Sequence, residues 1–200
     1  MQITIGNRNK GKTGVRLAFP ELHYAKAFQG QGEPAYSACF ILDPVENAED
    51  IKAIEDAIQA VAKEKWGAKA QAMLENLRKK DAICYVPGPK VSSRGDVYEG
   101  FEGKHHINAR NGGAPGKPAM KPTLIDADRS ILTPESGKPY AGCYVIASLD
   151  IWCQDNAYGT RINCSIRGVQ FRRDGQAFAG GTAASVDEFE EFVEDEEFFA

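Results

Sequence analysis

The residues most suggestive of chemistry stand near the N-terminus, where Gly6 to Thr13 matches the phosphate-binding pattern G-x-x-x-x-G-K-T. A loop of this kind holds phosphate because a helix begins at its lysine and directs backbone N–H groups at the anion. Here the loop is followed by residues of strand period and by Pro20. The pattern therefore favours a flexible basic loop over nucleotide hydrolysis. Its cations are candidates for contact with DNA phosphates: Arg8, Lys10 and Lys12.

Two other groups of residues could serve a metal ion or an acid–base step. His105 and His106 are adjacent, and neighbouring strand residues point to opposite faces, so the pair is poorly placed to bind one ion. A nuclease or phosphate-transfer enzyme would need clustered carboxylates around Mg²⁺. The most suitable set, Asp126, Asp128 and Asp150, has no recognisable spacing. We therefore predict no enzyme activity, no metal and no cofactor, and keep metal-dependent cleavage as an alternative that a cleavage assay would detect.

A broader signal lies in the middle of the chain, where cations are interleaved with aromatic residues. Residues 78–121 contain nine Lys or Arg against four acids, with Tyr85 among the aromatic residues. Single-stranded nucleic acid suits such a surface, because cations meet the phosphates and unpaired bases stack on rings whatever their sequence. The polar face of a later strand adds two arginines. The predicted DNA-binding residues are Lys90, Arg94, Tyr98, Phe101, Lys104, Arg110, Arg161 and Arg167.

The end of the chain is an acidic block of a different character. Eight acids follow a Gly-rich stretch at 180–185, and four phenylalanines are placed among them. Such charge density resists folding by itself, whereas a purely solubilising tail would have no use for aromatic residues. We predict a disordered tail that mimics the charge of DNA and docks partner proteins, with a terminal amphipathic helix as the alternative. The residues assigned this role are Asp187, Glu188, Glu190, Glu191, Glu194, Asp195, Glu196, Glu197, Phe198 and Phe199.

Charge is segregated along the chain. The whole sequence has a formal net charge of -4, whereas the part before residue 187 has 24 basic and 20 acidic residues and attracts polyanions. The sequence has no basic leader and no apolar run of about 18 residues, so we expect a soluble, intracellular protein without a membrane partner. The cysteines are odd in number and form no C-x-x-C pair, which predicts reduced core residues. They are Cys39, Cys84, Cys143, Cys153 and Cys164.

These residues must be positioned by a mainly β chain. Hydrophobic alternation and turn residues mark the strands, and the clearest alternation lies in the last strand, which has a cationic outer face. In the second strand, Pro20 is expected to end the run, and Phe19 is expected to share one side with Val15 and Leu17. Strands are predicted at 2–5, 15–19, 36–42, 82–86, 104–110, 121–125, 143–153 and 160–171.

A helical insertion interrupts the strands at about 44–80. Its apolar residues recur at spacings of three and four, which gives one face that packs against the body, and Gly67 is expected to break it after Trp66. Five or more strands with one insertion fit a small barrel better than a doubly wound sheet. The predicted fold is α+β and mainly β, with an OB-fold barrel over residues 1–179 and a flexible hinge and acidic tail at 180–200.

The chain resembles a family of bacteriophage single-stranded DNA-binding proteins related to the helix-destabilising proteins of short-tailed coliphages. The segments that carry the resemblance are Tyr98-Glu99-Gly100-Phe101, Tyr140 to Val145, Trp152 to Gly159, Gly168 to Phe171, Asp174-Gly175 and the acidic tail. The resemblance implies an OB-fold, protection of replication or recombination intermediates, and tail contacts with other replication proteins. One departure is that Ala200, and not phenylalanine, is the last residue.

Together, the residues and the resemblance predict a sequence-independent single-stranded DNA-binding protein that protects single strands in phage DNA replication, recombination or repair. A cationic groove follows the backbone, rings stack bases, and the tail competes with DNA and docks a polymerase or helicase. The alternatives are a metal-dependent nuclease or other phosphate-transfer enzyme, and a protein-only replication adaptor. The expected location is the cytoplasm of the infected bacterial host. The sequence leaves monomer and homodimer open.

Overall fold

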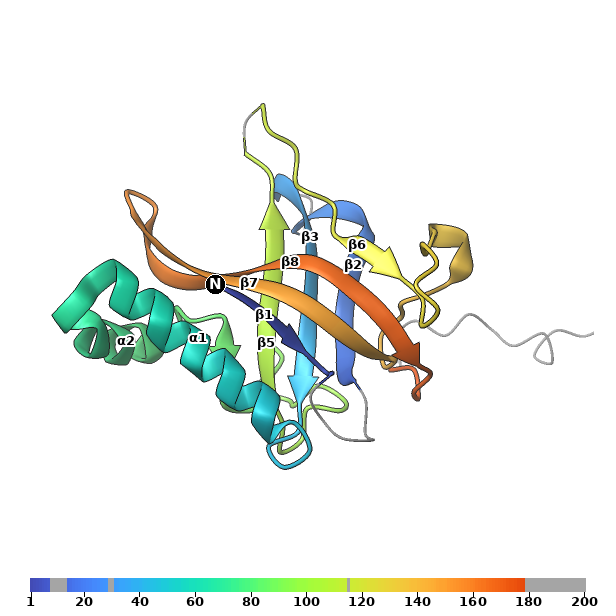
Figure 1. Cartoon of the computed structure of the whole chain (residues 1–200), viewed down its shortest axis with the longest axis horizontal. Coiled ribbons are helices and arrows are strands. Elements are labelled where there is room, and N and C mark those ends of the chain that lie inside the picture. Colours follow the sequence, from blue (N-terminus) through green and yellow to red (C-terminus); the bar gives the residue numbers. More distant parts are fainter. Residues whose placement is uncertain (8–13, 29–30, 115, 179–200) are drawn as a thin grey trace, which may run out of the picture.

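The computed structural model describes residues 1–7, 14–28, 31–114 and 116–178 (Figure 1). The strands are β1 (Gln2–Ile5), β2 (Val15–Phe28), β3 (Gln31–Leu42), β4 (Tyr85–Val86), β5 (His105–Gly112), β6 (Thr123–Ile125), β7 (Tyr144–Asn156) and β8 (Gly159–Arg173). The helices are α1 (Ala48–Trp66) and α2 (Ala70–Lys79), with 3-10 turns at Gly67–Lys69 and Pro134–Ser136. No helix in these ranges is long and apolar enough to cross a membrane. The tail and hinge, and the loop cations Arg8, Lys10 and Lys12, lie outside the described residues.

The strands form one sheet that folds over on itself. Its order is β4-β5-β3-β2-β7-β8-β6, with β1 paired to β7 beside this path. Neighbouring strands are antiparallel, except that β6 runs parallel to β8. In Figure 1, β1, β7 and β8 cross β2, β3 and β5, and the apolar core lies between the two sets. This arrangement confirms the prediction of a mainly β fold with one helical insertion.

The two ends of the folded sheet meet at β5 and β8, where a short segment at 82–84 fills part of the space between the strands. Ile162 of β8 donates its N–H to the carbonyl of Ala82 and accepts from the N–H of Cys84, both at 2.9 Å. On the opposite side, Asn108 of β5 donates its N–H to the carbonyl of Cys84 at 2.9 Å. The segment thus joins the two strands through its own backbone.

Further along the same junction, one side chain replaces the strand ladder. Asn111 of β5 is buried, and its amide Nδ2 donates to the carbonyl of Ile166 at 2.7 Å. Its Oδ1 accepts from the N–H of Ile166 at 2.8 Å. The amide therefore pairs with both the N–H and the C=O of Ile166. A neighbouring strand would otherwise bind these two groups. Within the described residues, strand pairing does not close the OB-type barrel, and the amide of Asn111 bridges β5 and β8 where this pairing is absent.

The helical insertion packs one face against the barrel. The buried residues Ile54, Ile58 and Val61 of α1 belong to the main core, as their spacing predicted. The helix ends at Trp66, and Gly67 follows with a φ of 54°, a left-handed conformation that glycine adopts without steric cost. Trp66 Nε1 donates to Asp155 Oδ2 at 2.9 Å, which ties the end of α1 to the β7–β8 hairpin.

Strand β2 departs from its prediction at Phe19 and Pro20. The strand continues past Pro20, and a bulge lets β2 advance three residues from Ala18 to Glu21 while β3 advances two. The extra residue turns the Phe19 side chain away from the core. Phe19 is 46% exposed. The expected inward position of Phe19, and the expected end of the strand at Pro20, are therefore wrong.

The barrel junction gives a stability prediction. Replacing Asn111 with leucine leaves the N–H and C=O of Ile166 without partners, and each buried orphan group costs about 1–3 kcal/mol. We expect the free energy of unfolding, measured in urea, to fall by at least about 2 kcal/mol. The control is Gln71→Ala, which removes an exposed amide on α2 and should change stability by no more than about 0.5 kcal/mol. Equal stability of the two variants would contradict the role of Asn111.

Candidate nucleic-acid interface

The outer face of β2, β3 and β5 carries a row of polar and aromatic side chains. Asn108 and Arg110 are two residues apart on β5 and project from the same face. Lys90 reaches over this face from the loop 87–104, and its Nζ donates to Asn108 Oδ1 at 3.1 Å. The same Nζ lies 5.9 Å from the ring centroid of Phe19 on β2. The row therefore runs across the strands from Phe19 to Arg110.

Two partly exposed rings stand at the β2 end of this row. The centroids of Phe19 and Tyr98 are 5.1 Å apart, and the ring planes meet at 76° in an edge-to-face contact. Tyr98 is 38% exposed. An edge-to-face pair is a favourable aromatic geometry, and it leaves ring surface available to solvent. Tyr98 thus offers ring surface to solvent, and its stacking role stays a prediction.

At its other end the row opens into a cleft of about 570 Å³ between β5 and the β7–β8 hairpin. Arg110 and Arg161 both line it, and Asp81 is the acidic residue of the lining. Trp152 of β7 is 40% exposed, and its Nε1 donates to Ser165 Oγ at 3.1 Å. This bond fixes the indole against the strand face. The polar lining also includes two amides that contact each other, Asn163 and Gln154.

We call the row and the cleft together the binding track. Its members are Phe19, Lys90, Tyr98, Asn108, Arg110, Trp152, Gln154, Arg161 and Asn163. Two of its cations contact neutral oxygen atoms, since Lys90 donates to the amide of Asn108 and Arg110 Nη2 donates to the backbone carbonyl of Glu33 at 3.3 Å. A neutral acceptor does not cancel the charge, so both cations keep their attraction for anions.

The loop 87–104 is held on the barrel by buried side chains. Phe101 is 1% exposed and packs with Ala18, Cys39 and Ile41 on the outer face of the sheet. His106 is also buried, its Nδ1 donates to the carbonyl of Gly88 at 2.9 Å, and its ring meets Phe101 edge-on at 5.6 Å. The prediction that Phe101 stacks on bases is therefore wrong for this structure, because its faces are covered by the barrel.

The other predicted DNA-binding residues lie apart from the track. Arg94 is exposed near the tip of the loop 87–104, beside Ser92. Lys104 Nζ is 2.5 Å from Asp43 Oδ2, and this hydrogen bond is the main reason why the pKa of Asp43 is lowered to about 2. Arg167 Nη1 donates to Gln2 Oε1 at 2.6 Å in a separate pocket beside β1. Of these cations, Lys104 has its charge balanced by a carboxylate.

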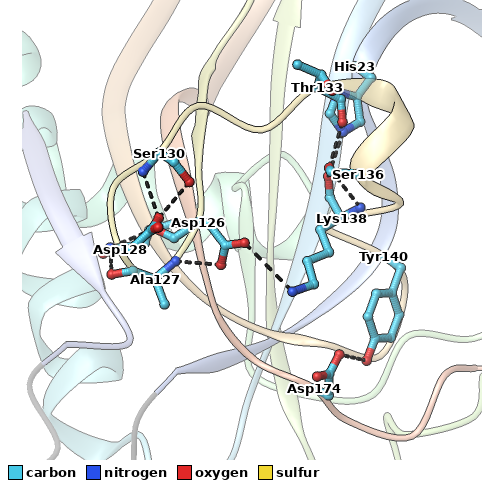
Figure 2. A network of polar contacts seen from close by, with 11 residues as sticks. His23, Asp126, Ala127, Asp128, Ser130, Thr133, Ser136, Lys138, Tyr140 and Asp174 are labelled. Carbon is cyan, nitrogen blue, oxygen red and sulfur yellow. Dashed lines mark hydrogen bonds and ion pairs between the residues drawn. The ribbon is translucent and has the colours of Figure 1, made fainter.

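The aspartates considered for a metal have separate partners. Figure 2 shows the ion pair of Asp126 with Lys138 and the hydrogen bonds of Asp128 with Ser130. Asp150 of β7 contacts the N-terminal ammonium at 2.9 Å, where β7 pairs with β1. Within the described residues, no group of three His, Cys, Asp or Glu side chains could hold a metal ion.

Hydrogen bonds and a cation–ring contact hold the last described residues against the barrel. Tyr140 Oη donates to Asp174 Oδ1 at 2.8 Å, as Figure 2 shows. Further on, Arg16 Nη2 donates to the carbonyl of Gln176 at 2.7 Å, and its guanidinium carbon lies 4.3 Å from the ring centroid of Phe178. The Phe178 ring packs against the cluster that contains Phe101. The last described residue, Phe178, therefore lies on the outer face of β2 and β3.

Sequence reasoning did not single out Phe19, Asn108, Trp152, Gln154 or Asn163 for this site. Trp152 carried a usable signal, because it is an aromatic residue close to the turn of a hairpin whose second strand has a cationic face. Phe19 carried none, because simple alternation assigns it to the core. A small barrel whose outer face carries cations, amides and accessible rings defines the class of OB-type nucleic-acid-binding folds.

Comparison with known proteins agrees with this class. The family model described as Enterobacter phage Enc34, ssDNA-binding protein matches residues 8–199, and the chain belongs to this family. It is 39% identical over 190 residues to protein p50 of Acyrthosiphon pisum secondary endosymbiont phage 1, covering 93% of this chain and 96% of that protein. Membership confirms the resemblance seen in the sequence and supports a non-enzymatic protein, and it gives no support to the nuclease alternative.

Solved structures show the same fold. The single-stranded DNA-binding protein from bacteriophage Enc34 in complex with ssDNA matches with a TM-score of 0.66 and 22% identity, covering 89% of each chain. The gp2.5 single-stranded DNA-binding protein of bacteriophage T7 matches with a TM-score of 0.54 and 8% identity, covering 92% of this chain and 98% of gp2.5. At these identities the likeness concerns the fold, and it confirms the predicted fold class.

The anchoring of the loop predicts a pH dependence of stability. Burial lowers the pKa of His106, so the folded protein favours the neutral ring more than the unfolded chain does. The stabilisation is complete at pH values above about 6.5, the pKa of histidine in the unfolded chain. It is lost as the pH falls through the lower pKa of His106 in the folded protein. We expect the melting temperature to drop on acidification from about pH 8 to about pH 5. His106→Gln keeps a hydrogen-bond donor for the carbonyl of Gly88 but does not titrate, so its melting temperature should drop less over the same pH range. Identical pH profiles of the two proteins would contradict the role of His106.

Proposed function

We propose that this protein binds single-stranded DNA along the binding track, without regard to base sequence. The observation that carries the proposal is the continuity of the track, in which Arg110 belongs both to the row on β5 and to the cleft. Cations contact the phosphates of a single strand, and rings offer faces on which any base can stack. Family membership and the DNA-bound state of the Enc34 protein support the same function.

The residues of the track divide between the two kinds of contact. Lys90, Arg110 and Arg161 are placed to meet phosphates, whereas Arg94 lies apart from them near the tip of the loop 87–104. Tyr98 and Trp152 supply the stacking faces, each worth about 1–3 kcal/mol per base in proteins of this type. The amides of the track add hydrogen bonds to bases or sugars without fixing a sequence. The cleft holds no helix that could read a major groove, and this supports a preference for single strands over duplexes.

The acidic tail is proposed to compete with DNA for the track. Its first acid, Asp187, follows Phe178 by nine residues, which span at most about 30 Å when extended. Because Phe178 packs against the cluster that contains Phe101, beside the Phe19 end of the track, this length supports contact between the tail acids and the cations of the track. Tethering keeps their local concentration high, on the order of mM. Phe198 and Phe199 would then dock a replication protein such as a polymerase or helicase when DNA displaces the tail.

The wider role follows from these contacts. We infer that the protein coats and protects single strands during phage DNA replication, recombination or repair, in the cytoplasm of the infected bacterial host. Coating requires only backbone and stacking contacts, because every sequence must be covered equally. A homodimer would be compatible with this role, as would a monomer.

The first test is a fluorescence titration with single-stranded and duplex oligonucleotides over a range of salt concentrations. We expect tighter binding to the single strand, and a log–log salt slope of about -0.7 for each phosphate contacted. Arg110→Gln and Arg161→Gln should each reduce the size of this slope by about 0.7. Lys52→Gln is the control, because its ammonium pairs with Asp56 on α1, and its slope should stay near the wild-type value. Equal affinity for duplex and single strand would overturn the proposed function.

A second test addresses the tail. Truncation after Ser185 removes all eight acids, so single-stranded DNA should bind more tightly, with the largest gain at low salt because screening weakens charge contacts beyond about 8 Å at 0.15 M salt. The double substitution Phe198→Ala and Phe199→Ala keeps every acid and should leave the competition largely intact while it impairs partner docking. The measurement is oligonucleotide affinity across a salt series. A truncated protein that binds no more tightly at low salt would show that the tail does not compete.

A further inference from the structure

Phe19 is held in a backbone conformation that is unfavourable for its residue type. Its φ is 49°, in the left-handed region, where bulky side chains are rare. It also precedes Pro20, and the residue before a proline is normally restricted to extended conformations. The bulge between Ala18 and Glu21 coincides with this residue. Without the bulge, alternation along β2 would bring the ring into the core.

The strained backbone presents an aromatic ring to solvent. Nearly half of the Phe19 side chain is exposed, although a phenylalanine gains most from burial. Its neighbours are the edge-to-face ring of Tyr98 and the ring of Phe101, whose centroid is 6.1 Å away at an interplanar angle of 27°. Phe101 is already buried in its own cluster, so the fold gains little from a second ring at the surface. Backbone strain that persists although much of the side chain stays exposed is characteristic of functional positions.

We propose that Phe19 is a stacking platform for a nucleobase, and that the bulge in β2 exists to aim its ring at the binding track. This inference deepens the proposed single-stranded DNA binding and rests on it. A base lying on the exposed part of the ring would have Tyr98 at its side. The ammonium of Lys90, 5.9 Å from the ring centroid, would be close to the phosphate of the same nucleotide.

The chemistry of the site fits a nucleobase better than an aliphatic or peptide ligand. A nucleotide brings a flat π face for the ring and a negative phosphate for Lys90. An apolar side chain would leave Lys90 without an anionic partner. From Lys90 the strand would continue over Asn108 and Arg110 to the cleft. The platform at Phe19 would thus hold one nucleotide at the β2 end of the track, and Trp152 would hold another at the hairpin end.

The test compares Phe19→Gly with the wild-type protein on two ligands, an oligothymidylate and a strand of equal length in which the bases are replaced by abasic sites. Glycine adopts a positive φ without steric cost, so this variant removes the ring and relieves the backbone together. We expect binding to the oligothymidylate to weaken by between about 5-fold and about 150-fold, which is the range of one stacking contact. On the abasic strand the two proteins should bind equally.

Two further variants and the melting temperature separate stacking from a structural role. Phe19→Tyr keeps a ring and should retain wild-type affinity, while Tyr24→Ala removes another exposed ring of β2 and should have no effect on binding. The melting temperature of Phe19→Gly should be unchanged or raised, because strain is relieved. An equal loss on the abasic strand, or a lowered melting temperature with unchanged binding, would overturn the platform role alone. Failure of the wild-type protein to bind any single strand would overturn the proposed function as well.

Discussion

The hydrogen bonds between the Asn111 amide and Ile166 are the constraint on which the rest of the structure depends. They join the two ends of the folded sheet at the point where no strand bridges β5 and β8 in the described part of the chain. A buried peptide group without a partner is costly, so this side chain holds the two strands together, as does the backbone of the segment 82–84 further along the junction. The cleft lies at this junction, and Arg110 of β5 and Arg161 of β8 both line it.

The outer face shows how a loop can be added to such a barrel without covering it. The loop 87–104 carries Lys90 and Tyr98, and it is fastened by two buried groups, Phe101 and His106. Because these anchors use the apolar part of the β3 and β5 surface, the polar side chains Asn108 and Arg110 remain accessible beside them. A single apolar patch thus positions the loop residues and leaves the adjoining surface open.

Much of the architecture could be predicted because it follows periodicity. The alternation of β8 correctly separates the buried Ile162 from the exposed Arg161, and the spacing of α1 correctly identifies its inner face. Among the residues predicted to bind DNA, Lys90, Tyr98, Arg110 and Arg161 lie on the proposed track, and their contacts with DNA stay predictions. Periodicity failed where a bulge shifted the alternation, at Phe19. Composition failed at Phe101, because an aromatic residue among cations can anchor a loop as readily as it can bind a ligand, and only tertiary contacts distinguish the two.

The groups that contact the cations differ between the proposed track and three other positions on the surface. Lys52, Arg78 and Lys104 all contact carboxylates, so their charges are balanced within the protein. Lys90 and Arg110 contact an amide and a backbone carbonyl, which orient the cations without neutralising them. Orientation by neutral acceptors lowers the entropy that a long side chain loses when it meets a phosphate, while the full charge is retained. A cation held by a neutral acceptor is therefore better suited to bind a phosphate than one paired with a carboxylate, and this applies to Arg167, held by the Gln2 amide, as well as to Lys90 and Arg110.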